Sequence, residues 1–257
     1  PIQKALAESF GLVLAEDVLS PIDMPPFPQS AMDGYAVALN GSNIFTLVGE
    51  VKAGDGHEPQ LNAGDAIRIF TGAPVPTSAD LVVRQEDCKS DESQVTVDPF
   101  PKKGANIRPK AEQTKKGEVA LSKGQVLNAA AIRYAATLVV TEVSVYQNPT
   151  VAILVTGNEL VAPSSDLNYG QIYESNAIML ESALKGYGIS DAAVYRVKDD
   201  YTSTREQLEE MLKAYDVILC SGGISVGDYD FVGKALNELG VEEVFYKIKQ
   251  KPGKPLY

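Results

Sequence analysis

The spacing of apolar residues in the second half of the chain predicts alternating strands and helices. Residues 151–155 (VAILV) form a continuous apolar run typical of buried strands, and residues 176–186 place Leu180 and Leu184 on one helix face. This alternation over residues 149–257 predicts a doubly wound parallel sheet. Further elements are expected as strands at 192–197, 216–220 and 241–249, as a helix opened by a capping box of Ser203 and Glu206, and as a helix at 230–239.

The first half of the chain has a different texture, with short β-type runs between Gly, Pro, Asn and Asp residues. Over residues 30–125 this pattern predicts an inserted all-β domain. Residues 1–29 and 126–148 are expected to form a small mixed α/β linker domain, and the prolines within 21–28 exclude regular structure there. The expected elements are helices at 4–10 and 128–138 and strands at 12–18, 36–39, 44–51, 66–70, 81–84, 94–97, 119–120 and 142–146.

Charge and residue usage narrow the chemistry that the chain can carry. Its 23 Lys and Arg against 34 Asp and Glu give a net charge of −11, which disfavours non-specific binding to nucleic acid. No apolar run approaches the roughly 18 residues of a membrane helix, and Cys88 and Cys220 form no metal or redox pattern. With His57 as the single histidine, catalysis must depend on carboxylates, hydroxyls, lysines and backbone amides. A reduced, cytoplasmic protein without membrane or nucleic-acid partners is expected.

Carboxylates follow three of the predicted parallel strands at the point where each strand ends. Glu159 comes shortly after the first strand, Asp199 after the second, and Asp228 and Asp230 after the third. Ligands of open α/β sheets bind in the crevice outside the carboxyl ends of the strands. Glu159, Asp199 and Asp230 could therefore hold Mg²⁺ beside a phosphate, since magnesium takes oxygen ligands. The alternative is a solvated polar rim above the sheet.

The loop after the third strand, SGGISVGD, is rich in glycine and leads into a helix. Its backbone N–H groups, unobstructed by Cβ atoms, could bind an anion. The alternative is a tight strand-to-helix turn with Asp228 or Asp230 as the N-cap. The candidate binding residues of this loop are Ser221, Gly222, Gly223, Ser225, Gly227 and Asp228.

A basic segment follows the last predicted strand, and it stands out in an acidic chain. Lys247, Lys249, Lys251 and Lys254 lie within eight residues without an acid, which favours an oxyanion site or else a solvated face. Two loops of the first half contain further candidate residues: Asp33 lies in 30–36 and Thr71 in 71–76. Taken alone, each loop predicts only a turn formed by Gly or Pro. Cys220 closes an apolar strand and is expected in the core.

Several motifs together resemble the molybdopterin molybdenumtransferase family, which includes bacterial MoeA and the gephyrin E domain. Their order and spacing run along the whole chain. The motifs are PPFPQSAMDGYA (25–36), TGAPVP (71–76), VVRQED (82–87), NIR (106–108), TGNEL (156–160), GQIYESN (170–176), SGGISVGDYD (221–230) and KPGKP (251–255).

The resemblance implies a fold, an activity and roles for particular residues. Such enzymes take adenylylated molybdopterin and molybdate, release AMP with a divalent cation, and leave molybdenum on the dithiolene. They are homodimers whose cleft lies between the α/β domain of one subunit and the β domain of the other. The resemblance implies that the functional acids and hydroxyl are Asp33, Thr71, Glu159, Asp199 and Asp230, of which Glu159 and Asp199 bind the metal. It implies that the Gly-rich loop binds the pterin phosphate. It also implies that Lys247, Lys251 and Lys254 contact the phosphate and molybdate.

The sequence departs from the family pattern at two positions and in its extent. Gln113 stands where a carboxylate is usual, and Asn158 stands where Asp is common. The chain stops at Tyr257 just after KPGKP, so we expect a truncated form of a longer enzyme. Two rivals remain: a molybdopterin adenylyltransferase, which the β-rich domain argues against, and a gephyrin-like scaffold that binds a partner peptide.

Overall fold

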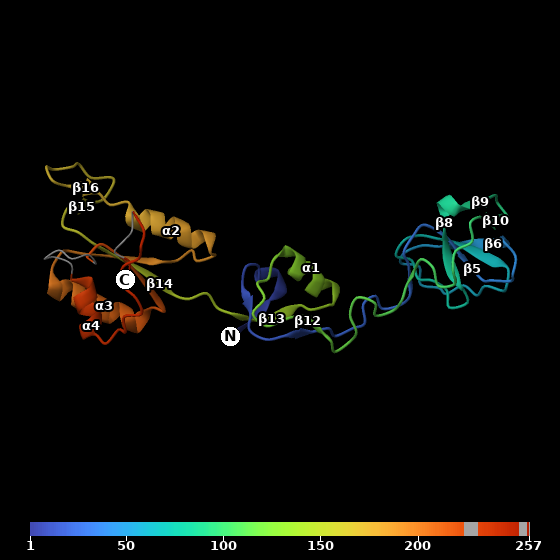
Figure 1. Cartoon of the computed structure of the whole chain (residues 1–257), viewed down its shortest axis with the longest axis horizontal. Helices are drawn as coiled ribbons and strands as arrows, with labels where there is room; N and C mark the ends of the chain where they lie inside the picture. Colours follow the sequence, from blue (N-terminus) through green and yellow to red (C-terminus); the bar gives the residue numbers. More distant parts are fainter. Residues whose placement is uncertain (224–230, 252–255, 257) are drawn as a thin grey trace. The chain divides into compact units, whose positions relative to one another are not determined.

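The structure, a computed structural model, describes residues 1–223, 231–251 and 256 (Figure 1). The chain divides into two compact units, Pro1–Tyr146 and Gln147–Tyr257. The second unit starts two residues before the predicted start of the α/β domain at residue 149. The finer division of the first unit into a linker domain and a β-rich domain stays a prediction.

A six-stranded mixed sheet dominates the first unit. Its order is β8-β5-β7-β6-β10-β9, in which β6 and β7 are parallel and the other neighbours are antiparallel. Successive side chains of β5 belong to two different apolar clusters. Tyr35 and Val37 belong to one cluster, and Ala36 belongs to the other. Both faces of this sheet are therefore covered. The strands are β5 (Gly34–Val37), β6 (Ile44–Val51), β7 (Asp65–Ile69), β8 (Leu81–Arg84), β9 (Cys88–Ser90) and β10 (Gln94–Val97).

The rest of the first unit consists of smaller sheets and one helix. A sheet of order β1-β13-β2 packs against α1. Leu127 and Ala135 are fully buried in the apolar core that the sheet and the helix share. Asn128 caps α1, because its Oδ1 accepts a 2.9 Å bond from the Ala131 N–H. The remaining bounds are β1 (Ile2–Ala5), β2 (Val13–Leu14), β3 (Val18–Leu19), β4 (Gln29–Ser30), β11 (Ile107–Arg108), β12 (Val119–Leu121), α1 (Ala129–Thr137) and β13 (Glu142–Tyr146).

The second unit contains the predicted parallel sheet. In the part of the chain that the structure describes, its order is β17-β14-β18, and β14 is parallel to both neighbours. A short parallel pair, β15 and β16, lies in the segment between β14 and α2. The bounds are β14 (Val151–Thr156), β15 (Leu160–Val161), β16 (Ile172–Tyr173), α2 (Asn176–Gly186), β17 (Ala193–Val197), α3 (Tyr201–Ala214), β18 (Val217–Ser221) and α4 (Val232–Glu238).

Helices cover both faces of this sheet, as a doubly wound arrangement requires. Alternate residues of β14 point to opposite faces. Leu154 belongs to a cluster with Leu208 of α3 and Val232 of α4, whereas Ile153 belongs to one with Ala177 of α2. The continuous apolar run of β14 is thus explained by burial on both sides.

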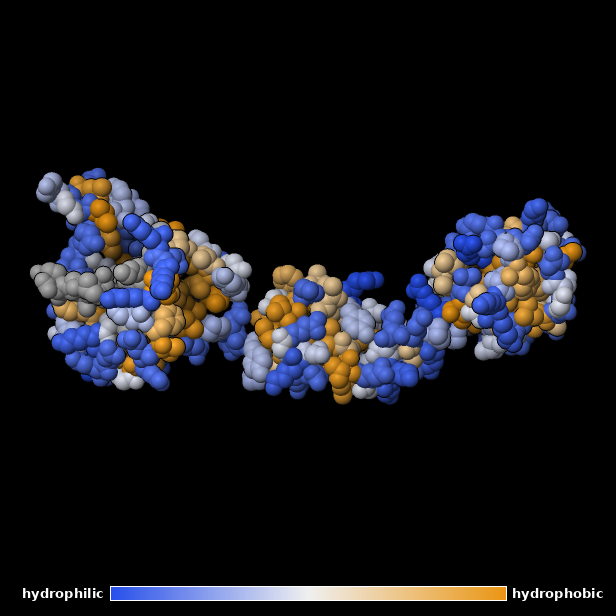
Figure 2. Space-filling model, in the orientation of Figure 1, coloured by the Kyte–Doolittle hydropathy of each residue, from blue (hydrophilic) through white to orange (hydrophobic). Residues whose placement is uncertain are grey.

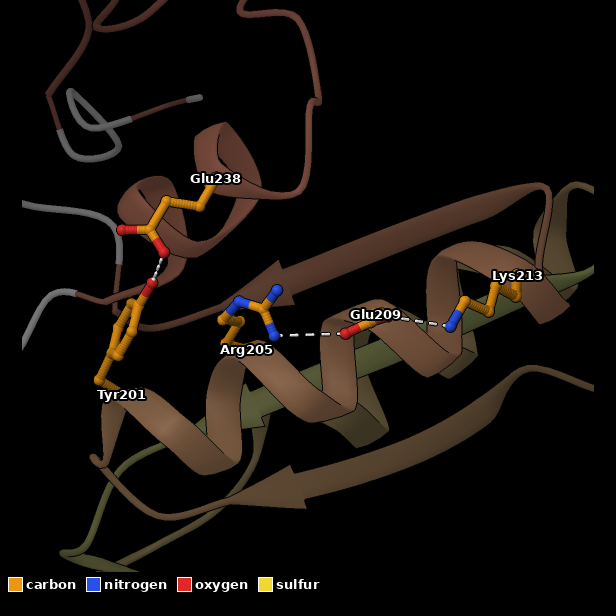
Figure 3. Close-up of polar contacts among 5 residues, drawn as sticks. All are labelled: Tyr201, Arg205, Glu209, Lys213 and Glu238. Atoms are coloured by element: carbon orange, nitrogen blue, oxygen red, sulfur yellow. Dashed lines mark hydrogen bonds and ion pairs between the residues drawn. The ribbon is translucent and has the colours of Figure 1, made fainter.

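Contacts between α3 and α4 hold one of these layers together (Figure 3). The Tyr201 hydroxyl at the start of α3 donates to the Glu238 carboxylate at the end of α4, and this bond raises the pKa of Tyr201. Along α3, Glu209 accepts bonds from Arg205 at 3.3 Å and Lys213 at 3.0 Å. The side chains of Arg205, Glu209 and Lys213 are partly to largely exposed to solvent, so these two ion pairs contribute little stability by themselves.

Several expected elements differ from the structure. Residues 4–10 are not a helix, because Ile2–Ala5 pair with β13 and only Leu6–Glu8 make a 3-10 turn. The strand expected at 12–18 is interrupted and becomes β2 and β3, whereas 21–29 remains irregular until β4. Residues 241–249 form no strand, and the ladders described for the sheet include none with this segment.

The start of α3 is also different from the prediction. Asp200, and not Ser203, is the N-cap, because its carboxylate accepts a 2.8 Å bond from the Ser203 N–H. The helix thus begins one residue after the cap, earlier than the capping-box pattern predicts. At α4 the helix begins at Val232 after Phe231, while the expected caps Asp228 and Asp230 lie outside the described residues.

Candidate functional site

Polar groups gather at the carboxyl ends of β14, β17 and β18. Because these strands are parallel and adjacent, the residues that follow them lie at one edge of the sheet. Two reciprocal hydrogen bonds connect Asn158 and Asp199 there. The Asn158 N–H donates to Asp199 Oδ2 at 3.0 Å, and the Asp199 N–H donates to Asn158 Oδ1 at 3.3 Å. The predicted convergence of strand ends is confirmed for these two segments.

Glu159 stands at the same edge and is exposed. Its backbone carbonyl accepts a 2.9 Å bond from the Ile172 N–H, so the β15–β16 pair fixes its position. Its Oε2 lies 3.0 Å from where a Cβ on Gly157 would be, so the side chain folds back over the strand end. The backbone of Glu159 is thereby fixed at the edge, next to Asn158.

The Ser221–Gly223 turn forms the other side of the edge. The Asn176 side-chain amide at the start of α2 donates a 2.8 Å bond to Ser221 Oγ. Gly222 has a φ of +96°, and a Cβ there would lie 2.7 Å from the carbonyl oxygen of Thr156. Only glycine lets the backbone pass so close to β14. The Gly223 carbonyl accepts a 3.1 Å bond from the Val232 N–H, which ties the turn to α4.

Asp200 has a structural task that separates it from its neighbour Asp199. The hydrogen bonds from Ser203 hold the pKa of the Asp200 carboxyl below its usual value. A carboxylate that accepts hydrogen bonds from a helix N-terminus has fewer free oxygen lone pairs with which to bind a ligand. Asp199 is half-buried and faces Asn158, so of the two acids it is the candidate for ligand binding.

The first unit carries a separate polar pair, Asp33 and Thr71. Asp33 Oδ1 accepts two 2.7 Å bonds from Thr71, one from the N–H and one from the hydroxyl. These bonds hold the pKa of Asp33 below its usual value, with a smaller effect from the charge of Arg68. Both side chains are exposed, and Asp33 is kept ionised and oriented.

Arg68 supports the loop that carries Asp33. Its guanidinium lies 5.0 Å from the ring centre of Tyr35 and 5.1 Å from that of Phe70, and it donates a 2.7 Å bond to Gln85. These contacts place a fixed positive charge beside the loop. Sequence reasoning missed Arg68, Asn176 and the hydroxyl of Thr156; the last two lie inside the quoted motifs GQIYESN and TGNEL.

The candidate basic residues are exposed where the structure describes them. Lys247 and Lys251 are solvent-facing, and the Lys247 Nζ lies 4.8 Å from the ring centre of Tyr246. The strand that would align Lys247 with Lys249 is absent. The candidates outside the described residues are Ser225, Gly227, Asp228, Asp230 and Lys254.

Glu159 and Asp199 are the two described carboxylates at this edge that could contribute to a magnesium site. Mg²⁺ is usually bound by one or two protein carboxylates together with substrate phosphates. Among the described residues, no group of three or more His, Cys, Asp or Glu side chains could enclose a metal by itself. With two carboxylate-bearing segments at this edge, any metal bound here would need further oxygen ligands from a substrate or from water.

The cysteines are poor nucleophiles. Burial raises the pKa of the Cys220 thiol to about 11, and burial together with the nearby Asp87 charge raises that of Cys88 to about 11. Thiols with such pKa values carry little thiolate at neutral pH. Cys220 packs against the core of the second unit, which confirms its predicted place.

A cavity of about 390 Å³ lies elsewhere in the second unit. Tyr215, Asp216 and Phe245 contribute to its lining. Asp216, just before β18, and Ile218 and Cys220 within it are alternate residues of the lining, so the cavity runs along one face of that strand, and its lining is mainly apolar. We therefore assign the candidate site to the polar edge. No helix in the described ranges has the length and apolar character needed to cross a bilayer.

The fold and the polar edge define a protein with a doubly wound α/β unit of the kind that binds ligands at the carboxyl ends of its strands. The model described as "Probable molybdopterin binding domain" matches residues 152–257, and the model described as "MoeA N-terminal region (domain I and II)" matches residues 1–139. The chain belongs to the MoeA family.

Named relatives agree with this assignment. The chain is 34% identical over 261 residues to the molybdopterin molybdenumtransferase of Staphylococcus aureus (strain Mu50), covering 98% of this chain and 62% of the relative. It is 38% identical over 254 residues to that of Nostoc sp. (strain PCC 7120), covering 96% and 58%. A crystal structure of the molybdopterin biosynthesis MoeA protein of Pyrococcus horikoshii OT3 superposes with a TM-score of 0.79 at 30% identity, covering 99% of this chain and 65% of that one. The chain thus spans about three fifths of the length of these curated relatives.

Proposed function

We propose that the whole protein is a molybdopterin molybdenumtransferase. It takes adenylylated molybdopterin and molybdate, releases AMP, and leaves molybdenum on the dithiolene of the pterin. The carrying observation is the polar edge: Asn158 and Asp199 bonded to each other, Glu159 beside them, and the Ser221–Gly223 turn opposite. Two family models that together match most of the chain, and the names of its relatives, support the same reaction.

The Gly-rich turn is proposed to bind the pterin phosphate. Backbone N–H groups of Gly222 and Gly223 can approach an oxyanion because no Cβ stands in the way. Ser221, already fixed by Asn176, adds a hydroxyl to this turn. Lysine side chains neutralise the dianions of phosphate and molybdate by charge. The remaining proposed binding residues are Ser225, Gly227, Asp228, Lys247, Lys251 and Lys254.

Mg²⁺ is proposed to be held by Glu159 and Asp199 together with substrate oxygens. When bound, it supplies positive charge that stabilises the departing phosphate of AMP. Asp199 is oriented for this role by the Asn158 N–H, which leaves its other carboxylate oxygen available. Asp230 is the third proposed acid, and the ionised Asp33, oriented by Thr71, is proposed as a further functional carboxylate.

The protein is proposed to act as a cytoplasmic homodimer. Apolar side chains gather on the visible surface of the second unit in Figure 2. On α2, Ile178 and Met179 are 54% and 55% exposed, and such exposed apolar residues favour a protein partner. The reaction also needs a supplier of adenylylated pterin, which must be an enzyme that transfers AMP to molybdopterin. The two reduced thiols agree with a reducing compartment.

The test is AMP release by the whole protein from adenylylated molybdopterin, with and without molybdate and Mg²⁺. We expect molybdate- and Mg²⁺-dependent release that falls at least tenfold in Glu159→Gln and Asp199→Asn. Each change removes a charge while keeping size and hydrogen-bonding capacity. Glu210→Gln, on the exposed surface of α3, is the matched control and should release AMP normally. Unchanged release in both site variants would refute the site, and no release by the wild type would refute the activity.

A further inference from the structure

Thr156 contains a buried hydroxyl that has no hydrogen-bond partner among the residues that the structure describes. It is the last residue of β14 and is 6% exposed. Among the described residues, its Oγ1 is the buried side-chain oxygen or nitrogen without a hydrogen-bond partner. Buried polar atoms are nearly always paired, because an unpaired one loses its bonds to water and gains none in return. Valine would fill the same space without this cost, so the hydroxyl needs an explanation.

The hydroxyl lies directly against the Gly222–Gly223 turn. A Cβ built on Gly222 would stand 2.7 Å from Thr156 Oγ1, and one built on Gly223 would stand 3.1 Å from it. The strand register agrees, since Val155 pairs with Ser221. The unpaired hydroxyl therefore faces the turn at the carboxyl edge of the sheet.

The neighbouring polar groups have partners of their own. Asn158 is bonded to Asp199, and Asn176 is bonded to Ser221. Within the part of the chain that the structure describes, no hydrogen bond joins Thr156 Oγ1 to these groups or to any other. A hydroxyl that lies against a glycine turn suited to oxyanions can be satisfied by the oxyanion itself.

We propose that Thr156 is a ligand-binding residue whose Oγ1–H donates to the substrate's phosphate when it occupies the Gly222–Gly223 turn. This inference rests on the proposed function and adds to it a binding group buried in the sheet. A hydrogen bond to a charged acceptor is stronger than one between neutral groups. Substrate binding then removes the cost of the unpaired hydroxyl and gains a bond to the phosphate.

The experiment is calorimetric titration of the whole protein with adenylylated molybdopterin, paired with thermal unfolding. Thr156→Val should bind at least about tenfold more weakly, while its Tm in the absence of ligand is equal to or above that of the wild type. Thr156→Ser keeps the hydroxyl and should bind within about twofold of the wild type. Tyr195→Phe is the matched control: it removes a hydroxyl that is paired with Tyr215 at 2.8 Å, so Tm should fall and binding should not change.

The outcomes separate this inference from the proposed function. Equal binding by Thr156→Val and the wild type would overturn the inference while leaving the proposed function standing. Binding by Thr156→Ser as weak as that by Thr156→Val would also overturn it, even if the valine variant is less stable than expected, because the hydroxyl would then not be the cause. Failure of the wild type to bind would refute the proposed function, and this inference with it.

Discussion

Gly34 is a position at which a single methyl group should damage both stability and function. It begins β5, directly after Asp33, and pairs with Arg84 of β8. A Cβ at Gly34 would lie 1.8 Å from the carbonyl oxygen of Val83, whereas ordinary contact begins at 3.4 Å. The obstacle is backbone, so no side chain can rotate away and the strands must separate locally.

The expected cost of Gly34→Ala follows from the bonds that this separation disturbs. The Gln85 N–H donates to the Asp33 carbonyl at 3.0 Å, and Arg68 donates to the Gly34 carbonyl at 3.4 Å. Loss of one or two such bonds at about 1 kcal/mol each, with a similar term for the forced backbone shift, gives about 2–4 kcal/mol. The same shift would displace the Asp33 carboxylate from Thr71 and lower AMP release.

Urea unfolding followed by circular dichroism measures the stability change, and the AMP assay measures the functional one. Gly56→Ala is the matched control, because a Cβ at Gly56 meets nothing within 4 Å; we expect a change within about 0.5 kcal/mol. If Gly34→Ala unfolds at the same urea concentration as Gly56→Ala, the close approach of β5 and β8 is wrong.

Three further changes test other parts of the structure. Thr71→Val removes one of two bonds to Asp33, so the pKa of Asp33 should rise towards its usual value, as measured by NMR titration; an unchanged pKa would exclude the hydroxyl bond. The folded-state pKa of Asp33 is depressed, so its contribution to stability is present above the unfolded-state pKa and is lost as pH falls through the folded-state value. Asp33→Asn should therefore weaken the fall in the free energy of unfolding at acidic pH, as measured by urea unfolding across a pH series. Leu208→Ala opens the fully buried core beneath α3 and should cost about 2–5 kcal/mol by urea unfolding, whereas a loss below 1 kcal/mol would contradict its burial.

Much of the secondary structure is predictable from local sequence. The predicted bounds of β6, β8, β10, β13 and α2 coincide with those of the structure. In these segments apolar spacing and flanking turn residues indicate the same element, so neighbouring residues are sufficient. The parallel sheet follows in the same way, because buried strands alternate with amphipathic helices.

Elements that need a distant partner were predicted less well. The helical pattern at 4–10 is overridden because Ile2–Ala5 gain a ladder with β13, more than 130 residues away. The segment at 241–249 shows the opposite case, since extended residues become a strand only when another strand pairs with them. At α3 the local signal was sufficient to predict a helix but misidentified the cap, because Asp200 and Ser203 are both suitable residue types.

The acids, amides and glycines at the strand ends, and their resemblance to a family, can be read from the chain without coordinates. How these residues are used depends on the folded arrangement. Asp199 faces Asn158 while the adjacent Asp200 caps a helix, and Asp33 meets Thr71 across 38 positions of chain. Thr156 lies in the TGNEL motif, but the sequence does not reveal that its hydroxyl is buried without a partner among the described residues. A hydrogen bond depends on distances between atoms, and folding sets those distances between residues that the sequence keeps far apart.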